Sequence, residues 1–107
     1  MKILHTSWGY NMTHNDFCKV ISETEKSVTC VMVRSEKITG GGYSGEEVVK
    51  PEAEYGKTFR LLKIAKTWGD GGIYYKGSYP FCGDDSKRLD SFVEIDPSKK
   101  FYYNTVD

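Results

Sequence analysis

Four side chains in the N-terminal third of the sequence have the chemistry to bind a metal ion or to act in catalysis: His5, His14, Cys18 and Cys30. A hairpin turn centred on Thr24 would pair Cys18 with Cys30 across two strands. Zinc needs further ligands at short, fixed spacings, and neither histidine belongs to an H-x-x-x-H or C-x-x-C arrangement. We therefore expect the two thiols to pack as small hydrophobic groups, and we predict neither a metal site nor a cofactor.

Motifs for catalysis are weak. Gly56-Lys57-Thr58 resembles the end of a phosphate-binding loop, but Pro51 stands where that motif needs its first glycine. The residues that follow have the pattern of a strand, whereas the motif requires a helix N-terminus. No G-x-S-x-G or H-E-x-x-H motif is present. We therefore predict that the protein is not an enzyme.

Aromatic residues on turns are the most informative feature. Five rings lie at expected turns beside glycine or proline: Trp8, Tyr10, Trp68, Tyr79 and Phe81. Rings held on turns can form an exposed stacking platform for a ligand. The alternative is that they cap the ends of the fold and only close its core. Arg60 and Arg88 could hold a phosphate near such a platform, which suits a nucleotide or a single strand of nucleic acid.

Period-two alternation of apolar residues predicts strands along most of the chain. The clearest case is a hairpin, in which residues 17–22 and 27–34 alternate on either side of the polar turn 23–26. Further strands are expected between turn residues at 1–5, 57–66, 71–77, 89–95 and 101–107. No segment has helical spacing over three turns. We predict an all-β (mainly β) fold: a small SH3-like or OB-like barrel, or a strongly bent antiparallel sheet, of six to seven short strands.

Chain length indicates a single β domain over residues 1–107, because 107 residues suffice for one core. Residues 35–56 contain five of the eleven glycines and a cluster of glutamates. That composition predicts a long Gly/Glu-rich loop with at most one short strand, at Glu47 to Lys50. Residues 78–88 are also expected to form a loop.

Charge and hydropathy narrow the set of partners. Fifteen Lys or Arg balance fifteen Asp or Glu, so no overall field draws the chain to nucleic acid or to an anionic membrane. The N-terminal apolar run is too short for a signal peptide, and no stretch approaches the ~20 apolar residues of a membrane span. Three cysteines without a C-x-x-C pair argue against a disulfide framework. We expect a cytoplasmic protein with no membrane partner.

Residues 7–17, SWGYNMTHNDF, followed by Val20, resemble a family of short uncharacterised proteins from bacteriophages and mobile elements. That family has a pattern like S-W-G-Y-D-Q-T-N-x-D-F-Y-x-V-V near its N-terminus, and a Y-P-W-D-G that is similar to residues 79–83, YPFCG. The sequence departs from the pattern at Asn11, Met12, His14 and Cys18. The resemblance implies a phage or plasmid origin and an all-β accessory protein.

The polar part of this motif adds Asn11, Thr13 and Asp16 to the residues expected to contact a ligand. Small accessory proteins of such origin commonly act on the host by binding. We therefore predict a non-catalytic inhibitor of a bacterial defence system in the host cell cytoplasm, which sequesters a nucleotide signal or binds a defence protein.

Two alternatives stay open. One is a small barrel that binds single-stranded nucleic acid by stacking bases on its rings. The other is a structural or regulatory phage component that forms a homo-oligomer through a sheet edge. Convergence of the rings on an open pocket near Arg60 or Arg88 would favour a small anionic ligand, whereas dispersal would favour a flat protein-binding surface.

Overall fold

The computed structural model describes residues 2–8, 13–41, 44–69, 71–80 and 87–104. Within these ranges the chain forms strands and contains no helix, so it offers none that is long and apolar enough to cross a membrane. The strands are β1 (Ile3–Trp8), β2 (His14–Glu23), β3 (Ser27–Gly41), β4 (Ser44–Ala65), β5 (Ile73–Pro80), β6 (Lys87–Ile95) and β7 (Lys100–Asn104). The predicted all-β class is confirmed.

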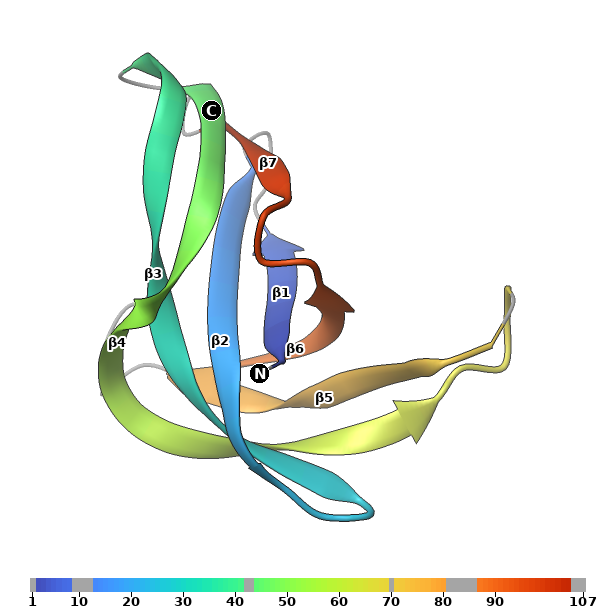
Figure 1. The fold of residues 1–107 in the computed structure, drawn as a ribbon. Coiled ribbons are helices and arrows are strands. Elements are labelled where there is room, and N and C mark those ends of the chain that lie inside the picture. The colour runs from blue at the N-terminus through green and yellow to red at the C-terminus, as the bar shows by residue number, and fades with distance from the viewer. Residues whose placement is uncertain (1, 9–12, 42–43, 70, 81–86, 105–107) are drawn as a thin grey trace.

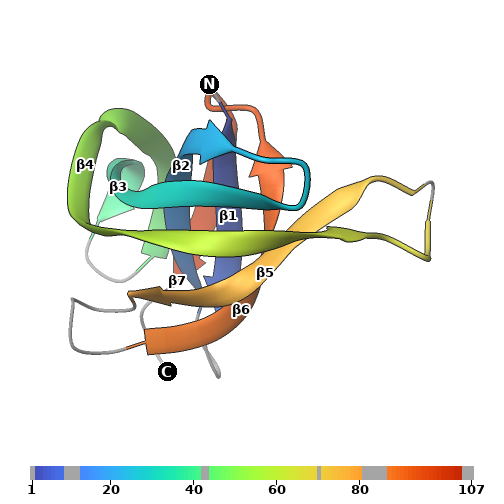
Figure 2. The ribbon, with the colours of Figure 1, turned by 90° about the horizontal axis from the view of Figure 1, so that it is seen from below.

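Strands β1 to β6 close into a small barrel, as predicted (Figures 1 and 2). Each strand pairs antiparallel with the next one in sequence, and β6 pairs with β1 to complete the ring. Ile3 lies opposite Ile95 and His5 opposite Val93 at this seam. The path is an up-and-down meander, in which closure removes the open edges that a flat sheet would expose.

Strand β4 is 22 residues long and serves two parts of the fold. Its C-terminal half pairs with the start of β3 and with β5, while its first residues pair with the end of β3 and with β7. Val33 lies opposite Glu54 and Ser35 opposite Val49, so residues 50–53 form a bulge between these pairs. Bulges bend a strand, and β4 changes direction sharply along its length (Figure 1).

The Gly/Glu-rich segment is not a loop. Residues 35–41 and 44–56 belong to β3 and β4, and together they form a long hairpin in which Gly40 lies opposite Gly45. The prediction of a loop over 35–56 is therefore wrong, because β3 and β7 provide pairing partners that override the weak strand propensity of Gly and Glu. Both ends of the predicted loop over 78–88 are strand instead, since β5 runs to Pro80 and β6 begins at Lys87, and residues 81–86 lie outside the described part of the chain.

The sheet made by β1, β2 and β3 is buried on both faces. Ile3, Leu4, Phe17 and Cys18 are each at most 1% exposed, although neighbours in a strand point to opposite faces. One face fills the barrel, in a cluster of Leu4, Cys18, Val28, Cys30, Met32, Leu61, Tyr75, Tyr79 and Phe92. The other face forms a second core of Ile3, Phe17, Val33 and Val49, against which Ile95 and Phe101 pack. Phe101 belongs to β7, so β7 helps to cover this second core.

The predicted hairpin of β2 and β3 is confirmed, but its expected register is wrong. Cys18 lies opposite Met32, and Cys30 lies opposite Val20. The difference arises because the turn is closed between Thr24 and Ser27 rather than centred on Thr24, and because a bulge follows Val20. Both thiols nevertheless share the barrel face.

Strands β4 and β5 continue beyond the barrel as a projecting hairpin, which we call the arm (residues 62–76; Figures 1 and 2). Leu62 lies opposite Lys76, and Ala65 opposite Ile73. At its tip Gly69, Gly71 and Gly72 have φ of 67°, 85° and 101°, which is backbone that residues with a Cβ rarely adopt.

Candidate functional site

A single carboxylate brings together three residues of the predicted site. Asp16 Oδ2 on β2 accepts hydrogen bonds from Trp8 Nε1 on β1 at 2.6 Å and from the Tyr79 hydroxyl on β5 at 2.9 Å. The Trp8 ring also stacks on His14, with 4.3 Å between ring centroids. These bonds join three strands at one end of the barrel, and they occupy the polar ends of both rings.

Tyr79 does not form an exposed stacking platform. It is 1% exposed, and its ring packs edge to face on Phe92 at 5.0 Å and lies 6.3 Å from Phe59. The expectation that this ring stacks on a ligand is wrong, because the period of β5 turns the side chain into the barrel. Trp8 is half-buried.

The other predicted residues lie apart from this carboxylate. Thr13 exchanges backbone hydrogen bonds of 2.7 and 2.9 Å with Asn104, and so joins β7 to β2. Arg60 is exposed on β4, opposite Thr29. Arg88 is in register with Tyr79, although only its backbone is described. Three predicted residues lie outside the described part of the chain: Tyr10, Asn11 and Phe81.

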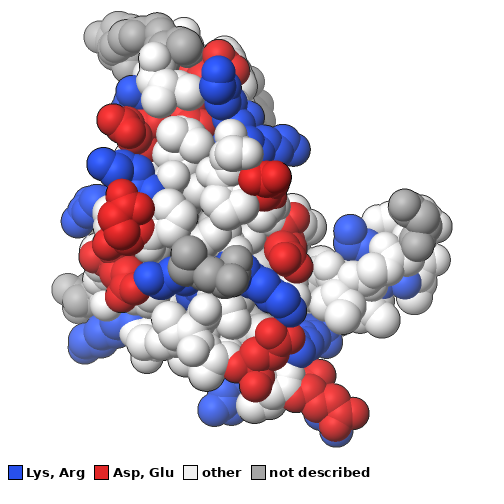
Figure 3. Space-filling view, viewed as in Figure 1, with Lys and Arg blue, Asp and Glu red and all other residues white. Residues whose placement is uncertain are grey.

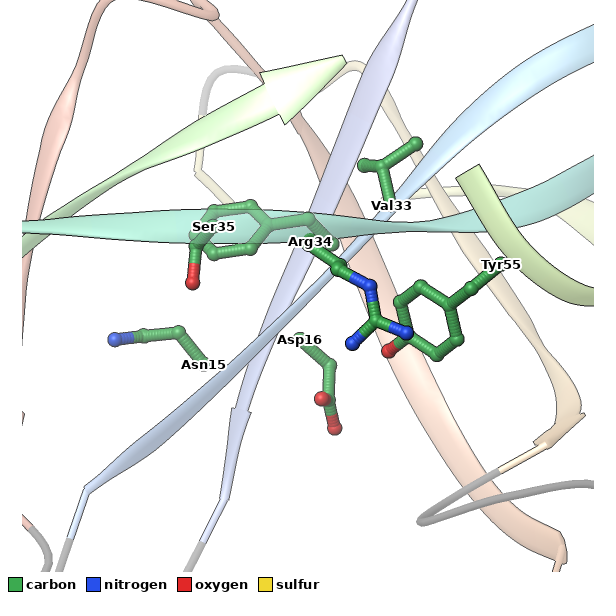
Figure 4. A pocket seen from close by; sticks show the side chains of 7 residues that line it. Asn15, Asp16, Val33, Arg34, Ser35 and Tyr55 are labelled. Atoms are coloured by element: carbon green, nitrogen blue, oxygen red, sulfur yellow. The ribbon is translucent and has the colours of Figure 1, made fainter. Parts of the chain in front are cut away.

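A cavity of about 250 Å³, which we call the polar pocket, opens between β2, β3 and the bulged part of β4. It is lined by Asn15, Asp16, Phe17, Val33, Arg34, Ser35 and Tyr55. Figure 4 shows Arg34, Tyr55 and Asp16 gathered on one side of it. The Arg34 guanidinium lies over the Tyr55 ring, with 4.4 Å from Cζ to the ring centroid. Of these residues the sequence predicted only Asp16; the others could have been found only from the correct register and the bulge.

Two residues that line the polar pocket, Asn15 and Ser35, belong to a partly buried network of polar side chains around Glu47. Asn15 Nδ2 donates to Glu47 Oε2 at 2.7 Å and to the Tyr102 carbonyl at 2.9 Å. Ser35 Oγ donates to the other oxygen of Glu47, which is only 5% exposed. Since the amide nitrogen of Asn15 donates both of its protons, its oxygen is the acceptor for His5 Nε2 at 2.8 Å. Glu47, which the sequence placed in a loop over residues 35–56, thus accepts hydrogen bonds inside the fold.

Burial sets the protonation of His5 and Cys18. Desolvation lowers the pKa of His5, against the opposing effect of its hydrogen bond to Asn15, so the ring is neutral at pH 7. The ring stacks on Phe101 with 4.0 Å between centroids. Desolvation raises the pKa of the Cys18 thiol, and its hydrogen bond with Cys30 acts in the same direction. Both thiols are free and buried, and the described residues include no group of three or more His, Cys, Asp or Glu that could hold a metal ion.

A second cavity, the arm pocket, lies on the outer face of the arm. Its volume is about 290 Å³, and it is lined by Lys66, Trp68, Tyr74, Ser91 and Val93. Trp68 is 60% exposed, and its ring is tilted against Tyr74 at 5.5 Å between centroids. Among the predicted rings that the structure describes, Trp68 is therefore the exposed one, and it lines the arm pocket.

Comparisons with models of protein families, with curated proteins and with solved structures found no match. The resemblance of residues 7–17 to a phage family therefore stays a prediction.

Proposed function

We propose that this protein is a non-catalytic binding protein that docks on another protein through the outer face of its arm. The observation that carries the proposal is the exposure of Trp68, which is 60% accessible although its indole is the largest apolar side chain. Tryptophan is strongly enriched among the residues that dominate binding energy at protein interfaces. The ring stands beside a concave apolar surface, the arm pocket, which a partner side chain can enter.

Neighbouring apolar groups extend this surface. Leu62 and Val93 are 54% and 39% exposed. Leu62 pairs with Lys76, which in turn pairs with Ser91, and residues paired across strands lie on one face. The same face therefore carries Leu62, Tyr74 and Val93 across β4, β5 and β6. Contiguous exposed apolar surface of this kind marks interaction sites.

Charge on the arm indicates what the partner offers. Residues 62–76 contain Lys63, Lys66 and Lys76 against one acidic residue, Asp70, so the segment has a net positive charge. Among the described atoms of the arm, Figure 3 shows blue on the visible face, whereas blue and red are mixed over the rest of the molecule. An apolar surface flanked by lysines is complementary to an apolar patch rimmed by acidic groups on a partner protein.

Among the predicted rings that the structure describes, Trp8 and Tyr79 meet at Asp16, whereas Trp68 lies apart from them on the arm. This separation supports a protein-binding surface at Trp68 over one enclosed site built from all the rings. The resemblance to a phage family supports the particular target that we propose, a protein of a bacterial defence system. The protein would then inhibit its target by covering the target's functional surface, which requires no catalysis by the inhibitor.

The test is phage infection of bacteria that carry one defence system at a time and express the chain. We expect the intact chain to restore plating and Trp68→Ala to lower it at least about tenfold, since an interface hot spot contributes ~2 kcal/mol or more. Tyr102→Ala is the matched control, because Tyr102 is 57% exposed on β7, away from the arm. If the Trp68→Ala variant restored plating as well as the intact chain, the arm would not be the binding surface.

Two further measurements distinguish between possible occupants of the arm. Titration calorimetry with the purified defence protein measures the contact directly, and sedimentation of the chain alone detects a second copy as the partner. Self-association that Trp68→Ala abolishes, without binding to the defence protein, would replace the proposed partner with a second copy of the chain.

Binding of single-stranded nucleic acid is a second candidate function. It is favoured by Lys66 in the arm pocket, next to the rings of Trp68 and Tyr74, because bases stack on aromatic groups near cations. Fluorescence anisotropy with labelled single strands at low salt tests it. Binding that weakens steeply with salt and is lost in Trp68→Ala supports this candidate, and no binding at low salt excludes it.

A further inference from the structure

We propose that the polar pocket binds a small molecule in which an anionic group, a phosphate or a carboxylate, stands close to a hydroxyl or amino donor. The residues involved lie on β2, β3 and the middle of β4, away from the arm pocket. This site therefore goes beyond the proposed function and does not depend on it.

Arg34 is the group that would hold the anion. Its guanidinium lies over the Tyr55 ring at 4.4 Å, which covers one face and leaves the in-plane N–H donors available. Among the described residues no carboxylate lies within ion-pair distance of Arg34. An arginine supported by a ring and left without a protein counter-ion suits a two-pronged contact with a carboxylate or phosphate.

Asp16 explains why Arg34 is unpaired, although both line the same pocket. Its Oδ2 accepts hydrogen bonds from Trp8 and Tyr79, so the carboxylate is fixed in position and does not turn towards the guanidinium. No described residue donates to its other oxygen, Oδ1, which can therefore accept a proton donor from a ligand. The negative charge of Asp16 repels a bare anion, so the pocket selects a ligand that brings a donor together with its anionic group.

The remaining lining residues limit the ligand further. The Asn15 amide and the Ser35 hydroxyl already donate hydrogen bonds to Glu47. They therefore shape the pocket wall and do not supply further donors to a ligand. Phe17 and Val33 also border the pocket, but their side chains are buried in the second core. A volume of about 250 Å³ is below the usual ~300–1,000 Å³ of sites for larger ligands. The pocket thus suits a hydroxy acid or one nucleoside monophosphate, and is too small for an oligonucleotide.

Amide NMR titration of the full chain tests the proposal with four probes. AMP joins a phosphate to hydroxyl donors, and malate joins carboxylates to a hydroxyl. Sulfate carries the charge without the donor, and adenosine carries the donors without the charge. We expect AMP, malate or both to shift the amides of Asn15, Asp16, Arg34 and Ser35, with sulfate and adenosine at least about tenfold weaker.

Two variants complete the test. Arg34→Gln should weaken the binding of AMP or malate at least about tenfold, because it removes the charged guanidinium group and keeps an exposed polar side chain. Arg60→Gln is the matched control, since Arg60 is also an exposed arginine on a strand but lies outside the pocket, and it should change nothing. The proposal is overturned if neither AMP nor malate shifts these amides at roughly 10 mM, or if Arg34→Gln binds as the intact chain does. The plating result for Trp68→Ala concerns the arm alone and does not bear on the polar pocket. Either proposal can therefore be overturned without the other.

Discussion

Asp16 holds three strands together through one carboxylate oxygen. Its two donors, Trp8 Nε1 and the Tyr79 hydroxyl, come from strands on either side of β6 in the barrel order. A hydrogen bond to an ionised carboxylate contributes more to stability than one between neutral groups. A residue that the sequence suggested as a ligand contact therefore also stabilises the barrel end beside which the polar pocket lies.

Removing this carboxylate should destabilise the fold. We expect Asp16→Ala to lower the free energy of unfolding by about 2–4 kcal/mol and Tyr79→Phe by about 1–2 kcal/mol, measured by urea denaturation. In the Asp16→Ala background, Tyr79→Phe should cost less than about 0.5 kcal/mol, because its acceptor is already absent. Additive losses in the double variant would contradict the hydrogen bond as the source of the effect.

His5 should make stability depend on pH. Its folded pKa is lowered by burial, whereas in the unfolded chain it titrates near its ordinary value of about 6.5. Above that pH the ring is neutral in both states and its contribution is complete. As pH falls below about 6.5, the unfolded state binds more protons, and stability is lost at up to about 1.4 kcal/mol per pH unit until the folded pKa is passed.

Urea denaturation between pH 5 and 8 measures this dependence, with His5→Gln as the variant that cannot titrate. The difference in unfolding free energy between the two proteins should be constant above about pH 6.5 and should change in favour of His5→Gln below it. An equal acid slope in both proteins would show that His5 is not the group responsible.

Cys18 and Cys30 should be unreactive in the folded protein. Both are 0% exposed, and the raised pKa of Cys18 keeps it as the thiol, which is the unreactive form. In a Cys82→Ser background, a thiol reagent at pH 7.5 should modify neither until urea unfolds the chain. Rapid modification in native buffer would contradict the buried placement of these residues.

At the scale of elements, β5 approaches β4 closely at one glycine. A Cβ on Gly77 would lie 3.0 Å from the Arg60 carbonyl oxygen and 3.1 Å from Leu61 Cδ2. The carbonyl belongs to the backbone and has little room to move. This close approach explains why a residue without a side chain stands in the middle of β5, just inside the point at which the arm leaves the barrel.

Gly77→Ala should therefore cost about 1–3 kcal/mol of unfolding free energy, measured by urea or thermal denaturation. Ser78→Ala, at the next and exposed position of the same strand, is the control and should stay within about 0.5 kcal/mol. An equal response of the two variants would mean that β4 and β5 tolerate a wider separation than the structure shows.

On the scale of the whole molecule, the barrel closes by pairing strands from opposite ends of the chain. Leu4 of β1 lies opposite Glu94 of β6, and its side chain is 0% exposed within the barrel core. We expect Leu4→Ala to lower the unfolding free energy by about 2–5 kcal/mol, which removes a large part of the stability of a small domain.

Leu62→Ala is the comparison, since Leu62 is 54% exposed on the arm and should change stability by less than about 0.5 kcal/mol. Chemical denaturation with a fluorescence readout measures both variants. A similar loss in the two would show that the arm is part of the folded core rather than a surface that projects from it.

Local sequence determined most of the strands, with the long hairpin within residues 35–56 as the exception. Alternation over residues 17–22 and 27–34 and the polar turn between them predicted the first hairpin, because the period of a strand is a property of neighbouring residues. The same reasoning placed the strands of the C-terminal half and the all-β class. It also selected Trp68, since a ring beside a glycine-rich turn lies beyond the last paired residues of its hairpin.

Tertiary structure decided the remaining features. Whether residues 35–56 pair, which residue lies opposite Cys18, and whether Tyr79 points inward all depend on contacts between segments far apart in the chain. Composition does not predict these contacts. A glycine or glutamate becomes part of a strand whenever neighbouring strands on both sides form hydrogen bonds with its backbone. The polar pocket has the same origin: a bulge in β4 and a shift of register bring Arg34, Asp16 and Tyr55 to one cavity.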